Sequence, residues 1–214
     1  SPMITEKNLK LPFISLLVSG GHTILTLVKD NSDYEVLGKT LDDSAGEVFD
    51  KVARHLGLAY PGGPEISKAA SNTNKSSYKF PRPMIKTNCY NFSFSGLKTN
   101  VTQLINKLEL NDLIISEIAY DFENSIIDVL ITKTLKAAKE YNIENIVIAG
   151  GVSANRKLRM RCNLEKGEKK IFFPDIAYST DNGAMIAYIG WLKSSKKTED
   201  NSLEINPNPS SRFV

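Results

Sequence analysis

The chain has 214 residues, of which 41% are hydrophobic and 24% charged, as in a globular protein with a substantial core. Lysine and arginine exceed aspartate and glutamate by 27 to 24, and a net charge of +3 is too small to indicate a nucleic-acid partner by itself. No signal peptide, membrane span or C-x-x-C pair is recognisable, which argues against secreted, membrane and thiolate-metal proteins and favours a cytoplasmic one.

Three β-strands are predicted at the start of the chain, at residues 13–19, 23–29 and 34–40. β-Branched and aliphatic residues fill these runs, and turn-forming residues separate them, with Gly20-Gly21-His22 in the first gap. We therefore expect an antiparallel meander.

A helix is predicted over residues 43–58, because its apolar residues recur at helical spacing. Ser44 and Glu47 match the S-x-x-E capping box, which places the helix start near Ala45, and Gly57 ends the helix.

The middle of the chain predicts further helices between polar and proline-rich loops. A short helix is expected at residues 64–71. A short strand that begins near residue 91 is expected to run into a helix that ends at about residue 108. Residues 112–140 are expected to form one long helix or a kinked helix pair packed on the sheet.

The last third alternates between strands and helices. The predicted order is a strand at 145–149, a turn at Gly150-Gly151, a helix at 153–161, a strand at 170–173 and a helix at 181–192. This alternation is typical of a parallel sheet with helices on its faces, so the fold class is α/β. Residues 1–195 are expected to belong to one fold, and residues 196–214 to form a polar tail with little to bury.

Three glycine pairs could carry chemistry, namely Gly20-Gly21, Gly62-Gly63 and Gly150-Gly151. Glycine lets backbone N–H groups approach a phosphate, and a helix that starts just after it favours an anion. A turn that needs positive φ accounts for each pair taken singly. The three pairs together are typical of the walls of one nucleotide cleft.

Two aspartates are open to alternative interpretations. Asp50 belongs either to a solvated acidic face with Glu47 or to a ribose-binding wall, because a carboxylate accepts hydrogen bonds from two hydroxyls. Asp181 stands at a helix start, where it is either an ordinary cap or an oxygen ligand for a cation. His22 has no credible Ser or Cys partner for a catalytic triad, and His55 is interpreted as a surface or packing residue.

Five longer stretches resemble the TsaD family of tRNA N6-adenosine threonylcarbamoyltransferases, formerly called glycoproteases or O-sialoglycoprotein endopeptidases. They are VSGGHT at 18–23, LDDSAGEVFDKVARHLGLAYPGGP at 41–64, FSFSGLKT at 92–99, IAGGVSANRKLR at 148–159 and STDNGAMIAYIG at 179–190. The resemblance covers residues 12–192 and is closest to bacterial or organellar members.

The resemblance implies an actin-like ATPase fold of the ASKHA, ribonuclease H-like type. It also implies transfer of a threonylcarbamoyl group from threonylcarbamoyl-AMP to N6 of the adenosine beside the anticodon in tRNAs that read ANN codons. Two alternatives remain open: a small-molecule kinase or ATPase of the same fold, and a non-catalytic dimerising module.

The resemblance also assigns site residues, none of them catalytic. Substrate-binding roles fall on Leu17, Val18, Ser19, Gly20, Gly21, Asp50, Gly63 and Asn155, and a metal-binding role on Asp181. The first five would contact the phosphate and carbonyl side of the adenylate, Asp50 the ribose, and Gly63 and Asn155 the adenine and ribose walls. Lys98 and Arg156 are either phosphate contacts or solvated surface charges.

The resemblance further implies one divalent metal, iron or zinc, with two ligands from an H-x-x-x-H pair that precedes the hairpin in family members. Because this sequence lacks the pair, we expect it to be the C-terminal two-thirds of a family member, from a truncated or fragmentary gene, and incomplete for activity alone. The expected partners are threonylcarbamoyl-AMP, tRNA, and a TsaB-like homologue with a TsaE-like ATPase, or a homodimer.

Overall fold

The computed structural model of the chain describes residues 2–31, 33–175, 178 and 183–194. Residues 1–180 and residues 181–214 form two units, each with its own internal contacts. The second unit contributes helix α7 (Gly183–Ser194), and the expected tail at 196–214 lies outside the described residues.

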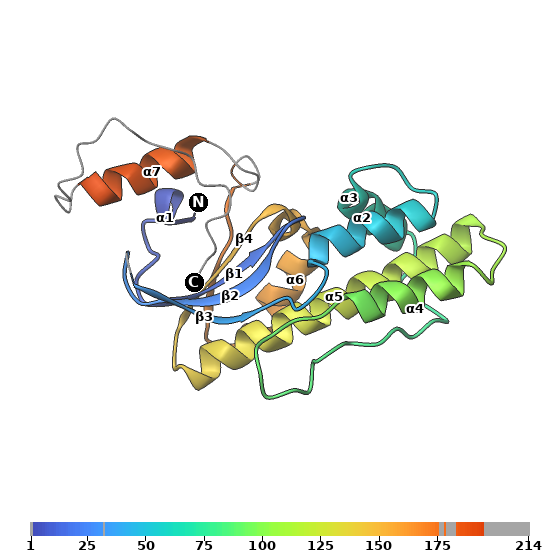
Figure 1. Cartoon of the computed structure of the whole chain (residues 1–214), viewed down its shortest axis with the longest axis horizontal. Coiled ribbons are helices and arrows are strands. Elements are labelled where there is room, and N and C mark those ends of the chain that lie inside the picture. Colours follow the sequence, from blue (N-terminus) through green and yellow to red (C-terminus); the bar gives the residue numbers. More distant parts are fainter. Residues whose placement is uncertain (1, 32, 176–177, 179–182, 195–214) are drawn as a thin grey trace. The chain divides into compact units, whose positions relative to one another are not determined.

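Five strands of the first unit form one mixed sheet in the order β3-β2-β1-β4-β5 (Figure 1). Their bounds are Phe13–Val18 for β1, Thr23–Val28 for β2, Tyr34–Lys39 for β3, Asn145–Ala149 for β4 and Lys170–Phe172 for β5. β2 is antiparallel to β1 and β3, whereas β4 is parallel to β1 and β5. All five were predicted, and each ends within one residue of the expected position.

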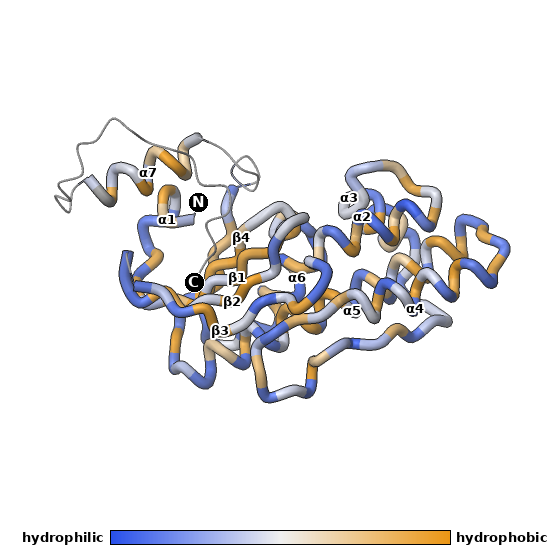
Figure 2. Tube along the Cα trace, in the orientation of Figure 1, coloured by the Kyte–Doolittle hydropathy of each residue, from blue (hydrophilic) through white to orange (hydrophobic). Residues whose placement is uncertain are grey.

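One face of the sheet carries the core because side chains alternate along a strand. On β1, Ile14, Leu16 and Val18 are buried, and the same period places Leu25 and Leu27 of β2 on the covered side. The long helix α5 (Asp112–Glu140) contacts β1 and β4, and the tube of Figure 2 shows apolar segments of both strands and of the helix.

The remaining helices of the first unit surround α5 or lead into the sheet. Their bounds are Pro2–Thr5 for α1, Ala45–His55 for α2, Gly62–Ala70 for α3, Ser95–Ile105 for α4 and Arg156–Glu165 for α6. α3 packs on α5 and on α2, and α2 also contacts α4. The Phe49 and Phe122 rings form a T-shaped pair with centroids 5.3 Å apart, which ties α2 to α5.

Several boundaries differ from the prediction for local reasons. The segment 112–140 is one helix, and the strand expected near residue 91 is reduced to a bridge between Thr40 and Phe92. The helix expected at 153–161 begins at Arg156, after a short 3₁₀ turn (Gly151–Ala154). Asn155 causes this delay, since its side chain caps the helix by accepting the Leu158 N–H.

Helix α5 is long enough to span a membrane but not apolar enough, and no other helix among the described residues is both long and apolar enough to do so. Its buried surface includes charged residues, Asp121, Glu123 and Lys133, each with hydrogen-bond partners. These three buried charges are therefore stabilised by hydrogen bonds to neighbouring helices and loops inside the protein.

Candidate functional site

The turn between β1 and β2 places Gly20 and Gly21 at the surface. Ser19 closes the turn: its N–H donates to the carbonyl of His22 at 2.8 Å, and its Oγ accepts from the N–H groups of Gly21 and His22. Neither glycine has a left-handed φ, and a Cβ built on either would meet no described atom within 4 Å. The fold therefore does not require glycine at these two positions, which removes positive φ as the explanation for this pair.

This turn packs against the start of α2. Ser44 Oγ donates to the Gly20 carbonyl at 2.6 Å, the Ala45 N–H donates to Thr23 Oγ1, and the Gly46 N–H donates to the Ser19 carbonyl at 3.1 Å. Gly46 is required here, since its Cβ would lie 2.6 Å from the Ser19 carbonyl oxygen. The first turn of α2 therefore holds the hairpin in place and has few N–H groups left for an anion.

The third glycine pair lies beside the same hairpin. Gly150 has φ +92°, and a Cβ there would lie 2.4 Å from the carbonyl oxygen of Val18. This close approach brings the 3₁₀ turn after Gly150 into contact with β1 and α2. Gly151 is exposed, and its Cβ position is open among the described atoms. Gly20-Gly21 and Gly150-Gly151 thus follow the carboxyl ends of the adjacent parallel strands β1 and β4, where α/β sheets bind ligands.

Asp50 and the second glycine pair meet between α2 and α3. Asp50 Oδ1 accepts the Gly62 N–H at 2.7 Å, and a Cβ on Gly62 would lie 2.6 Å from the Asp50 Cα. Gly63 has open space at its Cβ position as far as the structure describes the chain. Glu47 instead pairs with Lys51 at 2.7 Å, so the two carboxylates of α2 have different partners.

Asn155 joins α6 to α3 and α5. Its Oδ1 accepts the Leu158 N–H at 2.8 Å, and its Nδ2 donates to Ser67 Oγ at 2.9 Å and to Glu123 Oε1 at 2.8 Å. Both amide protons of this side chain are used internally. Sequence reasoning missed Glu123, whose signal is a carboxylate within the apolar stripe of residues 112–140.

Lys98 forms an ion pair with Asp43, which also contacts Lys51 at 3.2 Å. Burial alone would raise the pKa of Asp43, but hydrogen bonds from the two lysines outweigh it and hold that pKa below its ordinary value. Lys98 and Arg156 were expected to be either phosphate contacts or solvated surface charges. In the structure Lys98 is paired with Asp43, whereas Arg156 is exposed at the start of α6.

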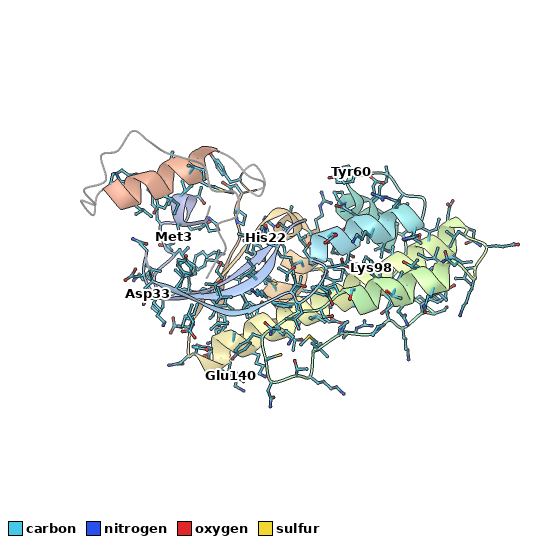
Figure 3. The ribbon with its side chains drawn as sticks, in the orientation of Figure 1. Met3, His22, Asp33, Tyr60, Lys98 and Glu140 are labelled. Atoms are coloured by element: carbon cyan, nitrogen blue, oxygen red, sulfur yellow. The ribbon has the colours of Figure 1, made fainter. Side chains whose placement is uncertain are left out.

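The other expected site residues differ in accessibility. Leu17 is half-buried and Val18 fully buried, and exposed His22 lies at the turn beside the start of α2 (Figure 3). Asp181 lies outside the described residues. Within the described ranges, no group of three or more His, Cys, Asp or Glu side chains is placed to hold a metal ion.

Comparison with solved structures concerns the fold. HypF from T. kodakarensis has a TM-score of 0.67 at 15% identity, with 89% of this chain and 35% of HypF covered. A full-length HypF in a phosphate- and nucleotide-bound form has a TM-score of 0.68 at 14% identity, with 92% of this chain and 41% of that protein covered. Component A of an (R)-2-hydroxyglutaryl-CoA dehydratase from Acidaminococcus fermentans has a TM-score of 0.52 at 17% identity, over 92% of this chain and 66% of that protein.

Comparison with known sequences concerns the family. Residues 1–188 match the model of TsaD, tRNA N6-adenosine threonylcarbamoyltransferase. Proteins of that name are 49% identical in Thermosipho africanus, over 96% of this chain and 63% of the relative, and 46% identical in Ralstonia pickettii, over 90% and 58%. The chain thus spans less than two-thirds of the length of these relatives. It belongs to the TsaD family of tRNA N6-adenosine threonylcarbamoyltransferases and corresponds to a C-terminal portion of its members.

Proposed function

We propose that this chain forms the adenylate-binding part of an enzyme that transfers threonylcarbamoyl from threonylcarbamoyl-AMP to N6 of the tRNA adenosine beside the anticodon. The observation that carries the proposal is that Gly20-Gly21 and Gly150-Gly151 both follow the carboxyl ends of the adjacent parallel strands β1 and β4, with Gly150 packed on Val18. Family membership favours this reaction over a small-molecule kinase, an ATPase or a non-catalytic module.

We further propose that the fold is of the actin-like ATPase, ribonuclease H-like type. The strand order β3-β2-β1-β4-β5, with an antiparallel first half and a parallel second half, supports this assignment. In such sheets the ligand lies beyond the carboxyl ends of the parallel strands, where the two glycine turns are found.

The backbone of the hairpin turn would bind the phosphate and carbonyl side of the adenylate. Ser19 Oγ now accepts from the N–H groups of Gly21 and His22, and an anionic substrate oxygen could take its place by rotation of the serine side chain. The absence of a Cβ on Gly20 and Gly21 leaves the approach to these N–H groups unobstructed.

Asp50 would bind the ribose. Its Oδ1 is fixed by the Gly62 N–H, and no hydrogen bond to its Oδ2 is found in the described part of the chain. A carboxylate held in this way can accept a ribose hydroxyl with little loss of side-chain entropy, because its rotamer is already set. Gly63 and the wall that contains Asn155 would flank the nucleoside.

The reaction needs no nucleophilic side chain. The adenosine amine attacks the carbamoyl carbon, the new C–N bond forms, the bond from that carbon to the phosphate oxygen breaks, and AMP leaves as the amine gives up a proton. Backbone N–H groups at the hairpin would stabilise charge on the carbonyl and phosphate oxygens in the transition state.

A divalent metal, iron or zinc, forms part of the proposal, with Asp181 as one ligand. A carboxylate suits such an ion, but one carboxylate is too few for a divalent site, and the proposal takes the two histidines of an H-x-x-x-H pair as the further ligands. When bound, the metal would supply Lewis acidity for the threonylcarbamoyl group. The proposal also includes a cytoplasmic setting, and a TsaB-like homologue with a TsaE-like ATPase, or a second copy, as partners.

Calorimetric titration of the chain with AMP tests the ribose contact. We expect Asp50→Ala to weaken AMP binding about tenfold, the loss of one charge-assisted hydrogen bond. Glu47→Ala, on the same helix and paired with Lys51, is the matched control and should bind AMP like the wild type. Equal AMP affinity in both variants would remove Asp50 from the site.

Transfer of labelled threonylcarbamoyl from its adenylate to tRNA tests the reaction. The chain is joined for this purpose to the H-x-x-x-H region of a family member. Asp181→Ala is expected to abolish transfer, and full transfer by that variant would exclude Asp181 from the metal site.

A further inference from the structure

Glu123 places a carboxylate inside the molecule, between three helices. It lies on α5 with 2% of its surface exposed. Its Oε1 accepts from Ser67 Oγ of α3 at 2.6 Å and from Asn155 Nδ2 at 2.8 Å, and its Oε2 lies 3.6 Å from Lys157 Nζ of α6. A charge at this depth is tolerated only because each oxygen has a polar partner.

The helices that Glu123 joins carry two walls of the candidate site. α3 begins at Gly62, whose N–H holds Asp50, and Ser67 lies on that helix. α6 is capped by Asn155, which directly follows the 3₁₀ turn after Gly150. Asn155 Nδ2 also donates directly to Ser67 Oγ at 2.9 Å, so the two walls and Glu123 form one hydrogen-bonded cluster, in which Glu123 Oε1 accepts from both side chains.

We propose that Glu123 is a positioning residue that fixes the spacing between the Gly62-Gly63 wall and the Gly150–Asn155 wall, and thereby sets the affinity for the adenylate. The choice of an adenylate as the ligand rests on the proposed function, whereas the positioning of Ser67 and Asn155 by Glu123 rests on the observed hydrogen bonds. Glu123 acts through Ser67 and Asn155, since it is too deeply buried to touch the nucleotide.

The role depends on the length of the side chain and on its acceptor oxygen. Aspartate is one methylene shorter, about 1.5 Å less reach, so it cannot accept from both partners in place. Glutamine keeps an acceptor of the same reach but loses the charge that faces Lys157. Lys157 also lies over the Tyr120 ring, with Nζ 3.9 Å from the centroid, so glutamine leaves the lysine one of its two favourable contacts.

Titration with AMP compares four variants of the chain. We expect Glu123→Ala and Glu123→Asp to weaken AMP binding by about tenfold, in line with the loss of a buried hydrogen-bond partner, and Glu123→Gln by about threefold or less. Glu117→Ala is the matched control, because Glu117 lies on the same helix but accepts only the Ser77 N–H. In the transfer assay, the KM for threonylcarbamoyl-AMP should rise in Glu123→Ala while kcat changes less.

Hydrogen exchange at the Leu158 amide supplies a readout that needs no nucleotide. This N–H donates to Asn155 Oδ1, so a loosened Asn155 should let it exchange several-fold faster in Glu123→Ala, with Glu117→Ala unchanged. If Glu123→Ala does not fold, Glu123→Asp and Glu123→Gln keep the test, with faster Leu158 exchange expected in Glu123→Asp and little change in Glu123→Gln.

The outcomes separate this inference from the proposed function. A wild-type chain that does not bind AMP contradicts the proposed function and the effect on affinity, while faster Leu158 exchange still supports the positioning of Asn155. Unchanged Leu158 exchange in Glu123→Ala overturns the positioning role. AMP binding that is equally weak in Glu123→Gln and Glu123→Ala overturns it as well, because restoring the acceptor should restore the spacing.

Discussion

Two walls of the candidate site are built in different ways. At the hairpin wall, Ser19 to His22, the groups offered to a ligand are backbone N–H groups at glycines with open space around them. At the wall around Asn155, the side-chain amide is hydrogen-bonded within the protein, to Ser67, Glu123 and the Leu158 N–H. The comparison teaches that the two walls differ in construction: the hairpin presents open glycine backbone, whereas the Asn155 wall is fixed by buried side chains, so the proposed ligand contacts of the hairpin would be backbone contacts.

The largest expected effect separates two neighbouring glycines. Gly150→Ala should destabilise the protein by about 3 kcal/mol or more, because its φ is left-handed and its Cβ would collide with the backbone of β1. Gly151→Ala should change the free energy of unfolding by about 0.5 kcal/mol or less, since that position is open. Urea denaturation measures both, and equal stability of the two variants would contradict the packing of Gly150 on Val18.

A second prediction compares two helix caps. Asn155→Ala should cost about 2 kcal/mol, because it removes a cap and deprives Glu123 of a buried partner. Asn111→Ala removes the exposed cap of α5 and should cost about 1 kcal/mol. The same denaturation measurement applies, and a larger loss in Asn111→Ala would contradict the account of the Asn155 wall.

The third prediction concerns pH and lies outside both walls, at the start of α4. Burial alone would raise the pKa of Asp42, but hydrogen bonds from Ser93, Phe94 and Ser95 outweigh it and lower that pKa. A folded-state pKa below the unfolded one stabilises the protein above the unfolded pKa, and this stabilisation is lost as the pH falls through the folded pKa.

Asp42→Asn should therefore lower the urea midpoint at pH 7, and the difference from the wild type should shrink below about pH 4, where the unfolded carboxyl is protonated. Asp112→Asn, an exposed change in the first turn of α5, controls for the loss of one surface carboxylate. A difference that stays constant down to pH 2 would show that the charge of Asp42 is not what stabilises this region.

The smallest expected change in stability is at the hairpin wall. Gly20→Ala should alter the free energy of unfolding by about 0.5 kcal/mol or less, because its Cβ meets open space. AMP binding should nevertheless weaken, since the added methyl group would obstruct the approach of a phosphate to the N–H groups of Gly21 and His22. Gly96→Ala, in an open position within α4, should leave AMP binding intact. An unaffected AMP affinity in Gly20→Ala would remove the hairpin from the site.

Much of the architecture could be predicted from local patterns. The five strands follow from runs of β-branched residues, and the start of α2 follows from Ser44 and Glu47, because capping and alternation act between residues close in sequence. The delayed start of α6 was missed, since it depends on whether Asn155 caps a helix or lies inside one.

The candidate site was predicted less completely. Glycine pairs and Asp50 are visible as residue types, but their partners are not. Asp50 meets Gly62 twelve residues later in the chain, and Asn155 meets Ser67 across 88 residues. The first contact arises from the packing of α2 on α3 and the second from the packing of α3 and α6 on α5, which no local pattern encodes.

The sequence by itself determined the strands, the main helices, the family motifs and the glycine pairs, because these depend on residue types and short spacings. The tertiary structure alone decided that Gly20 and Gly21 are open while Gly46 and Gly150 are enclosed, since identical residues differ only in what packs against them. It also decided that Glu123 accepts hydrogen bonds from Ser67 and Asn155, because these residues are far apart in the sequence and are brought together only by the packing of the helices.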